Sequence, residues 1–281
     1  MRKTLLMIRF GVVIPQEGVE FSAIRDIVHQ CENLGFDSIW LYDHVFWSSE
    51  PFLECWTCLS ALASETKDLR LGTLVINNTL RSPALLAKMA ATLDVITGGR
   101  LEFGIGAGTT NPKEYLAYGI PFTKSSERIG RLKEAVQIIH KMWTEEKPSF
   151  EGKYYTVKDA FCEPKPIQKP HPPIWIGGKG EKLTLKVVAE FADGWNFCDS
   201  VDDYERKMNL LSKYCSRVGR KASDIQRSWH GGFLLAQNEQ KLKEKIRKLM
   251  PRSTPIDEYM RRTHLIVSTQ EQCIEIIDRY I

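Results

Sequence analysis

The chain has 281 residues, 43% of them hydrophobic, and a formal net charge of +4 at pH 7. This length and apolar content suffice for one large domain or two small ones, and no shift in composition marks a boundary between two. The positive charge is small and interspersed, which argues against nucleic acid as a partner. The one basic cluster, residues 241–252, is more simply interpreted as the solvated face of an amphipathic helix.

The sequence contains no run of about 18 apolar residues, so we expect no membrane span. It begins MRKTLLMIRFGVVIP, basic and then apolar as in a signal peptide, but it lacks a small-residue cleavage site. We therefore interpret the apolar part as a first strand and expect a cytoplasmic protein. Seven scattered cysteines, an odd number, fit reduced thiols better than a disulfide framework.

Strand and helix patterns alternate along the first part of the chain. Short runs rich in branched apolar residues predict strands, and apolar residues at helical spacing predict helices. Strands are expected at residues 9–14, 37–42, 71–76 and 101–105, and helices at 21–34, 52–64 and 83–96. Ser82 and Pro83 are an N-cap and first-turn signal for the third of these helices, and two glycines end it.

A long excursion at residues 110–172 interrupts this alternation. It contains one strong helix pattern at 126–143, and its aromatic- and proline-rich remainder predicts a hairpin and an irregular cover rather than a domain. The alternation then resumes, with strands at 174–176, 194–197 and 228–236 and helices at 181–191 and 201–218. The last predicted element is a helix at 270–280.

This order of elements predicts an α/β fold with a parallel sheet, and eight such units would close a TIM (β/α)8-type barrel. The patterns give seven strands, and no strand follows the last helix. We therefore expect a barrel of this type that lacks its eighth strand, either because the sequence is truncated or because another element seals the gap. It would be a single domain over residues 1–281, with 110–172 as an insertion after the fourth strand.

Asp43 and His44 come directly after the second predicted strand, where barrel enzymes place catalytic groups. A histidine can donate or accept a proton near neutral pH, and an adjacent carboxylate can tune it. The alternative is a histidine in an ordinary surface loop. The other histidines show no metal-ligand spacing, so no metal site is expected.

Glycine-rich strand ends complete the candidate site. Residues 73–78 and 106–111 lie at the carboxyl ends of the third and fourth strands, where parallel α/β folds bind ligands, and are expected to form walls of one pocket. The glycines of the second segment let the backbone approach a ligand closely. Residues 176–182, IGGKGEK, form a phosphate-binding turn or simply a tight connection from strand to helix. Neither stretch completes the dinucleotide-binding spacing, which disfavours nicotinamide binding in the Rossmann manner.

Cys55 and Cys58 have the spacing of a redox motif but lie within an apolar helical stretch. Residues three apart share one face of a helix, so two packed thiols are the preferred interpretation. Ser60 and Ser64 have no G-x-S-x-G pattern around them, which argues against a hydrolase nucleophile.

Together these residues resemble the luciferase-like monooxygenase superfamily, and within it the branch of coenzyme F420-dependent oxidoreductases. The resemblance extends from FGVVIPQ to about Asn196 and is carried by LGFDSIWLYDH, LRLGTLVINNTLRSPALLAKMAATLDVITGGRLEFGIGAG, RLKEAVQIIHKMW and PHPPIWIGGKGEK. It implies a TIM-like barrel with the flavin or deazaflavin ring at the carboxyl ends of the strands. It also implies a non-prolyl cis peptide at Leu74–Val75, next to the ring.

The resemblance implies roles for individual residues. His44 would give or take a proton beside the transferred hydride, oriented by Asp43. The residues expected to hold the cofactor are Thr73, Leu74, Val75 and Asn77 at the ring, Gly106, Ala107, Gly108 and Thr109 at its edge, and Gly177, Gly178, Lys179 and Gly180 at its phosphate. Several sugar-phosphate-oxidising relatives have a glutamate where this chain has Thr109. That departure argues against an acid–base role at this position and against a sugar-phosphate substrate.

The leading hypothesis is an oxidoreductase that moves a hydride between coenzyme F420 and a small organic substrate, which residues 110–172 would cover. One alternative is a two-component FMN monooxygenase, which needs a separate flavin reductase. Another is a non-catalytic flavin- or F420-binding barrel protein. A homodimer is expected by analogy with the family, and an unpaired edge of the barrel would favour association.

Overall fold

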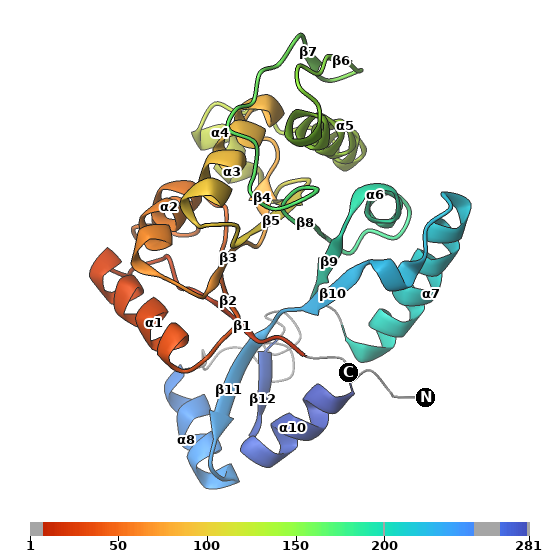
Figure 1. Ribbon diagram of the computed structural model, residues 1–281. Coiled ribbons are helices and arrows are strands. Elements are labelled where there is room, and N and C mark those ends of the chain that lie inside the picture. The colour runs from red at the N-terminus through yellow and green to blue at the C-terminus, as the bar shows by residue number, and fades with distance from the viewer. Residues whose placement is uncertain (1–7, 199, 250–264, 280–281) are drawn as a thin grey trace, which may run out of the picture.

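The computed structural model describes residues 8–198, 200–249 and 265–279, and its centre is a curled parallel sheet (Figure 1). The path of the sheet is β1–β2–β3–β5–β8–β9–β10, and the short β4 pairs with β5 beside it. The bounds are Gly11–Val13 (β1), Ser38–Leu41 (β2), Arg70–Thr73 (β3), Ile76–Asn77 (β4), Leu101–Gly106 (β5), Ile174–Gly177 (β8), Gly194–Phe197 (β9) and Gln226–Trp229 (β10). This confirms the predicted α/β class, and no other strand of the described residues joins this sheet.

The first and last strands of the path face one interior. Arg9, just before β1, donates a hydrogen bond to the side chain of Gln226, the first residue of β10. At the carboxyl ends of the strands, the ring of Tyr42, after β2, lies 6.4 Å from the ring of His230, after β10. The carboxyl ends of the strands therefore meet around a common centre, as in a TIM-type barrel.

Helices cover the outside of the curled sheet (Figure 1). Their bounds are Phe21–Asn33 (α1), Cys55–Glu65 (α2), Pro83–Ile96 (α3), Ser125–Thr144 (α5), Thr184–Phe191 (α6) and Val201–Arg217 (α7). Each presents an apolar stripe to the sheet, and all six residues of β5 are buried. Trp143 of α5 contacts Phe103 of β5 edge to face at 5.2 Å and donates to the Ala87 carbonyl of α3 at 2.9 Å. These contacts form one part of a core that also includes buried residues of α1, α2, α6 and α7.

The excursion at residues 110–172 contains more helix than the sequence predicts. It begins with α4 (Pro112–Ala117), continues through α5, and includes the antiparallel hairpin of β6 (Phe150–Glu151) and β7 (Thr156–Val157). The predicted helix and hairpin are confirmed. The six-residue α4 was missed, because it is too short to show a helical period.

Two strand predictions were wrong in detail, and one further strand was missed. The strand expected at 71–76 is divided into β3 and β4 by Leu74–Val75. The strand expected at 228–236 is divided into β10 and β11 (Gly232–Ala236), and β11 pairs with β12 (Leu265–Thr269), which was not predicted. Two consecutive glycines, 231 and 232, stand at the break, where they weaken a continuous strand.

The two-stranded sheet of β11 and β12 is accompanied by α8 (Glu239–Leu249) and α10 (Gln270–Asp278). These helices correspond to the predicted basic helix at 241–252 and the predicted helix at 270–280, over the parts that the structure describes. In the described residues no helix is both long enough and apolar enough to cross a membrane.

All seven cysteines are free thiols, and all except the partly exposed Cys198 are buried. Burial raises the pKa of Cys58 to about 11, so only about 10⁻³ of this thiol is ionised at pH 8. We expect a thiol reagent such as DTNB to titrate Cys198 first in the native protein, and all seven thiols in denaturant. Rapid modification of Cys55 or Cys58, located by peptide mass mapping, would contradict the packed-thiol interpretation.

Candidate active site

Asp43 lies just after β2 in a buried ion-pair network. Its carboxylate accepts hydrogen bonds from Arg81 at 2.7 and 3.0 Å and from the Asn77 N–H at 2.9 Å. Arg81 also donates to Glu54 at 2.5 Å, and Glu54 caps α2 by accepting two of its backbone N–H groups. The network therefore joins the end of β2 to β4 and to the start of α2.

One cation, Arg81, lies between the two carboxylates of this network. Burial raises the pKa of Asp43, and hydrogen bonds and charge from Arg81 oppose that rise. Burial also acts to raise the pKa of Glu54, but the N–H groups of α2 and the Arg81 charge prevail and lower it. Burial acts to lower the pKa of Arg81, but the two carboxylates raise it. Arg81 is thus a permanent cation that forms ion pairs with both Asp43 and Glu54.

His44 faces a different carboxylate. Its Nδ1 lies 3.2 and 3.1 Å from the two side-chain oxygens of Glu114, a residue of α4. The Glu114 side chain is 1% exposed and also accepts the Val45 N–H at 2.8 Å. The expectation that Asp43 orients His44 is therefore corrected: Asp43 is turned to Arg81, and Glu114 contacts the ring. No local pattern signals this partner, because 70 residues separate it from His44.

Aromatic side chains surround the ring of His44. The ring centroids of Trp47, Phe52 and Tyr42 lie 4.7, 6.3 and 6.5 Å from that of His44. The ring of His230, which the sequence analysis did not single out, also lies 6.4 Å from that of Tyr42. With these neighbours the His44 side chain is 18% exposed. Among the described residues no group of three or more His, Cys, Asp or Glu side chains is placed to hold a metal ion.

The residues that the sequence analysis assigns to a cofactor wall lie around Leu74–Val75. The peptide bond between these residues is cis, at the position that the resemblance implies. Thr73 Oγ1 donates to the Gly104 carbonyl at 2.7 Å and accepts the Gly104 N–H at 3.0 Å. The Thr73 hydroxyl thus bonds both backbone polar groups of Gly104 in β5, just beyond the last residue pair of β3 and β5, Gly72 and Glu102. The wall consists of the predicted residues Thr73, Leu74, Val75, Asn77, Gly106, Ala107, Gly108 and Thr109.

The glycines in this wall and beside it make room for protein atoms. A Cβ at Gly104 would lie 1.9 Å from the Thr73 carbonyl oxygen. A Cβ at Gly106 or Gly177 would lie 2.7 Å from Cγ2 of Val75. A side chain at any of the three would therefore displace this segment of the wall. The sequence analysis expected glycine to admit a ligand; at these positions glycine instead admits the Thr73–Val75 segment, and its effect on a ligand is indirect.

Replacing Gly106 with alanine should lower the free energy of unfolding by about 1–3 kcal/mol, the usual cost of overpacking a buried position. The added methyl group would meet Val75 Cγ2 at 2.7 Å. Adding Val75→Ala removes that methyl contact and should recover much of the loss. Urea unfolding of both single variants and the double variant measures the coupling. Strictly additive losses would show that the two positions do not compete for space.

The end of β4 carries two buried polar groups that lack a partner. Asn77 Nδ2 and Asn78 Oδ1 have no hydrogen-bond partner among the described residues. The other polar atom of each side chain is hydrogen-bonded: Asn77 Oδ1 accepts from the Thr79 hydroxyl at 2.6 Å, and Asn78 Nδ2 donates to the Tyr155 hydroxyl at 3.4 Å. A buried polar group without a hydrogen-bond partner lowers the stability of the fold. A donor and an acceptor at this wall therefore fit a bound molecule with polar atoms on its ring, as a flavin or deazaflavin has.

Gly108 and Thr109 connect the wall to α4. Gly108 has φ +89°, and a Cβ there would lie 2.2 Å from the Tyr115 hydroxyl and 2.4 Å from Asn77 Oδ1. Tyr115 also donates to the Thr109 carbonyl at 3.4 Å. Thr109 Oγ1 accepts the Asn111 N–H at 3.1 Å, so the side chain supports the turn into α4.

The predicted phosphate turn, residues 177–180, follows β8. Gly178, Lys179 and Gly180 are exposed, and the Gly178 carbonyl accepts from Trp195 Nε1 at 2.8 Å. The following helix α6 begins at Thr184, later than the predicted position 181. A turn at 181–183 therefore separates the glycines from the helix N-terminus.

Comparison with known proteins identifies relatives along most of the chain. The sequence model of the family described as luciferase-like monooxygenase matches residues 3–281. A protein named F420-dependent glucose-6-phosphate dehydrogenase, from Microbacterium testaceum (strain StLB037), is 33% identical over 227 residues, which are 78% of this chain. The chain spans 66% of that relative's length. A protein of the same name from Amycolatopsis mediterranei (strain U-32) is 28% identical over 291 aligned positions, covering 92% of this chain and 85% of the relative.

A solved structure supports the same fold. An F420-dependent secondary alcohol dehydrogenase in complex with an F420–acetone adduct has a TM-score of 0.83 and 20% identity, over 97% of this chain and 89% of that chain. At this identity the likeness concerns the fold, and it confirms the predicted TIM-type architecture. With a family match over nearly its whole length, the chain belongs to the luciferase-like monooxygenase family.

Proposed function

We propose that the chain is an oxidoreductase that transfers a hydride between coenzyme F420 and a small organic substrate. The observation that carries the proposal is the pairing of His44 with buried Glu114 at the strand ends, next to a wall with unsatisfied polar groups. The relative named F420-dependent glucose-6-phosphate dehydrogenase, at 33% identity, supports F420 as the cofactor.

F420, when bound, supplies the carbon that accepts or donates the hydride. The Thr73–Asn77 segment would hold its ring, residues 106–109 the edge of the ring, and residues 177–180 the phosphate. His44 would take the proton of a substrate hydroxyl as the hydride leaves the adjacent carbon, and would return it in the reverse direction. The aromatic side chains around His44 would keep water from the reacting atoms.

Fluorescence titration of the purified protein with F420 and, separately, with FMN tests the cofactor. We expect saturable quenching with F420 and much weaker binding of FMN. Tight binding of FMN alone would overturn the F420 assignment. Oxygen uptake with reduced FMN would then identify a two-component monooxygenase, whereas F420 binding without turnover on any alcohol or carbonyl substrate would favour a non-catalytic binding protein.

We also propose one barrel domain over residues 1–281, with residues 110–172 as an insertion that covers the substrate. The packing of α5 against α3 and β5 supports this assignment, because it joins the insertion to the barrel core. We place the protein in the cytoplasm, since none of its seven cysteines is in a disulfide and a reducing compartment keeps thiols in this state.

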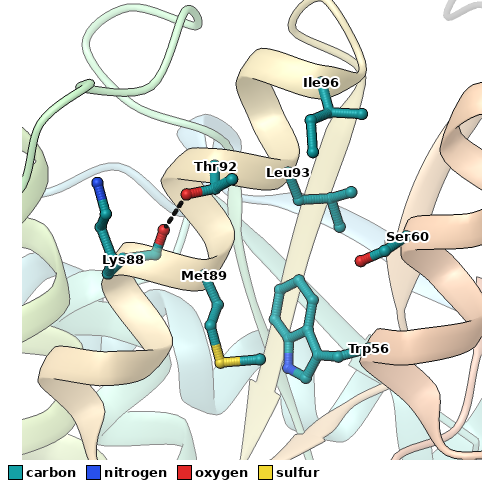
Figure 2. A pocket seen from close by; sticks show the side chains of 7 residues that line it. All are labelled: Trp56, Ser60, Lys88, Met89, Thr92, Leu93 and Ile96. Atoms are coloured by element: carbon teal, nitrogen blue, oxygen red, sulfur yellow. Dashed lines mark hydrogen bonds between the residues drawn. The ribbon is translucent and has the colours of Figure 1, made fainter.

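We propose a homodimer that associates through the α2–α3 surface. Leu85 and Ile96 of α3 are 56% and 55% exposed. Between the two helices is a groove of about 240 Å³, with Trp56 on one side and Met89 and Leu93 on the other (Figure 2). Exposed apolar surface of this kind is typical of protein interfaces. Nε1 of Trp56 is buried there without a hydrogen-bond partner among the described residues.

The variant Ile96→Glu should convert the dimer into a monomer, because it places a charge in the apolar contact. Light scattering across a dilution series measures the mass, and Ile274→Glu on α10, at a residue that is 62% exposed, serves as the matched control. A monomeric parent protein would contradict the dimer. A dimeric Ile96→Glu variant would contradict this choice of surface.

A further inference from the structure

We propose that Glu114 is a positioning residue that holds the proton of the neutral His44 ring on Nδ1. The inference rests on the proposed function, because it assigns a task in the same reaction. Both carboxylate oxygens of Glu114 lie within hydrogen-bond distance of Nδ1, at 3.2 and 3.1 Å. An ionised carboxylate only accepts hydrogen bonds, so the nitrogen that faces it carries the proton. Nε2 then presents its lone pair to a substrate hydroxyl.

Glu114 is itself held in place from two sides. The Val45 N–H donates to its Oε1 at 2.8 Å. The hydroxyl of the next residue of α4, Tyr115, lies 3.4 Å from both Asn77 Oδ1 and the Thr109 carbonyl oxygen, which share its one proton. One short helix therefore joins the cofactor wall to His44. The position of the histidine ring relative to a bound cofactor is set by this connection.

Glu114 is also the carboxylate available to balance charge on His44. Asp43 is adjacent in the chain, but its charge is paired with Arg81 at 2.7 Å. In the oxidation of an alcohol, bound F420 would supply the hydride acceptor, and Nε2 of His44 would take the hydroxyl proton. The imidazolium that forms is stabilised by Glu114, and it later releases the proton to solvent.

The variant Glu114→Gln tests this assignment sharply. The Val45 N–H, 2.8 Å from Oε1, requires the amide oxygen at that position, so the amide NH₂ replaces Oε2 at 3.1 Å from Nδ1. The amide oxygen also stays 3.2 Å from Nδ1, but a proton on Nδ1 would leave the buried NH₂ group facing another donor, without an acceptor. The NH₂ group therefore donates to Nδ1 and selects the tautomer with its proton on Nε2. The lone pair of Nε2 is then lost, and kcat should fall roughly 10²- to 10⁴-fold with KM little changed.

Nitrogen-15 NMR of the neutral histidine rings reads the tautomer directly, with His44 assigned by the signal missing in His44→Asn. We expect a protonated Nδ1 in the parent protein and a protonated Nε2 in Glu114→Gln. Glu102→Gln is the matched control, because it removes another buried carboxylate, near the amino end of β5, and should change neither tautomer nor kcat.

An unprotonated Nδ1 in the parent protein would overturn the inference, even if Glu114→Gln failed to fold. An unchanged tautomer in a folded Glu114→Gln variant would also overturn it, as would a fall in kcat that Glu102→Gln reproduces. The NMR measurement needs neither F420 nor substrate. Failure of F420 to bind would therefore refute the proposed function separately, while the tautomers still decide the role of Glu114.

Discussion

The variant His44→Asn is expected to lower kcat roughly 10²- to 10⁴-fold, the usual contribution of a positioned acid–base group. Asparagine is close in size to the inner part of the ring but cannot exchange a proton near neutral pH. The cofactor wall is built from other strand ends, so F420 affinity should change less than about threefold, and the loss should be one of kcat. Steady-state kinetics and F420 titration of the same preparation measure the two quantities.

A histidine on the outer layer provides the control for this variant. His29 on α1 lies 3.5 Å from Glu65 on α2, away from the strand ends. His29→Asn should leave kcat unchanged. If His44→Asn retained full turnover, the proton would have another carrier and the role assigned to His44 would be wrong.

The alternation of strands and helices could be predicted from the sequence because its signal is local. A branched apolar run or an amphipathic period is contained within each element, as in β5 and α3. The breaks were harder to predict. The Leu74–Val75 cis bond was expected from family resemblance alone, since nothing in residues 71–76 marks an interrupted strand.

The partners in the site could not be predicted, because they come from distant parts of the chain. Asp43 and His44 are adjacent, and adjacency suggested that they interact. In the folded chain Asp43 bonds to Arg81, 38 residues away, and His44 to Glu114, 70 residues away. Two neighbouring residues after a strand point in different directions, so each takes a partner from a different segment. Only the tertiary structure determines which segment that is.

Replacing Arg81 with methionine is expected to lower the free energy of unfolding by about 3–5 kcal/mol, the cost of leaving a buried charge unpaired. The Asp43 side chain is 1% exposed and that of Arg81 is 15% exposed. Urea unfolding measures the loss. As a control, Arg131→Met removes a cation from a half-exposed pair with Glu127, and should cost about 0–1 kcal/mol. A loss no larger than that of the control would contradict a buried role for Arg81.

The loss in Arg81→Met should also depend on pH, in a direction that the charges determine. Burial already raises the pKa of Asp43 above its ordinary value of 3.8, and removal of Arg81 raises it further. A carboxyl with a raised folded pKa carries no penalty below its unfolded pKa, and its penalty grows as the pH rises toward the folded value. Arg81→Met should therefore lose less stability at pH 5 than at pH 8.

The double variant Asp43→Asn/Arg81→Met carries neither charge of the pair, so its stability should vary less between these pH values and exceed that of Arg81→Met at pH 8. Asp43 also accepts the Asn77 N–H at 2.9 Å, at the end of β4. The loss of Arg81 in Arg81→Met should therefore loosen the end of β4 as well and weaken F420 binding. Equal losses at both pH values would show that Arg81 supports the wall by packing rather than by balancing the charge of Asp43.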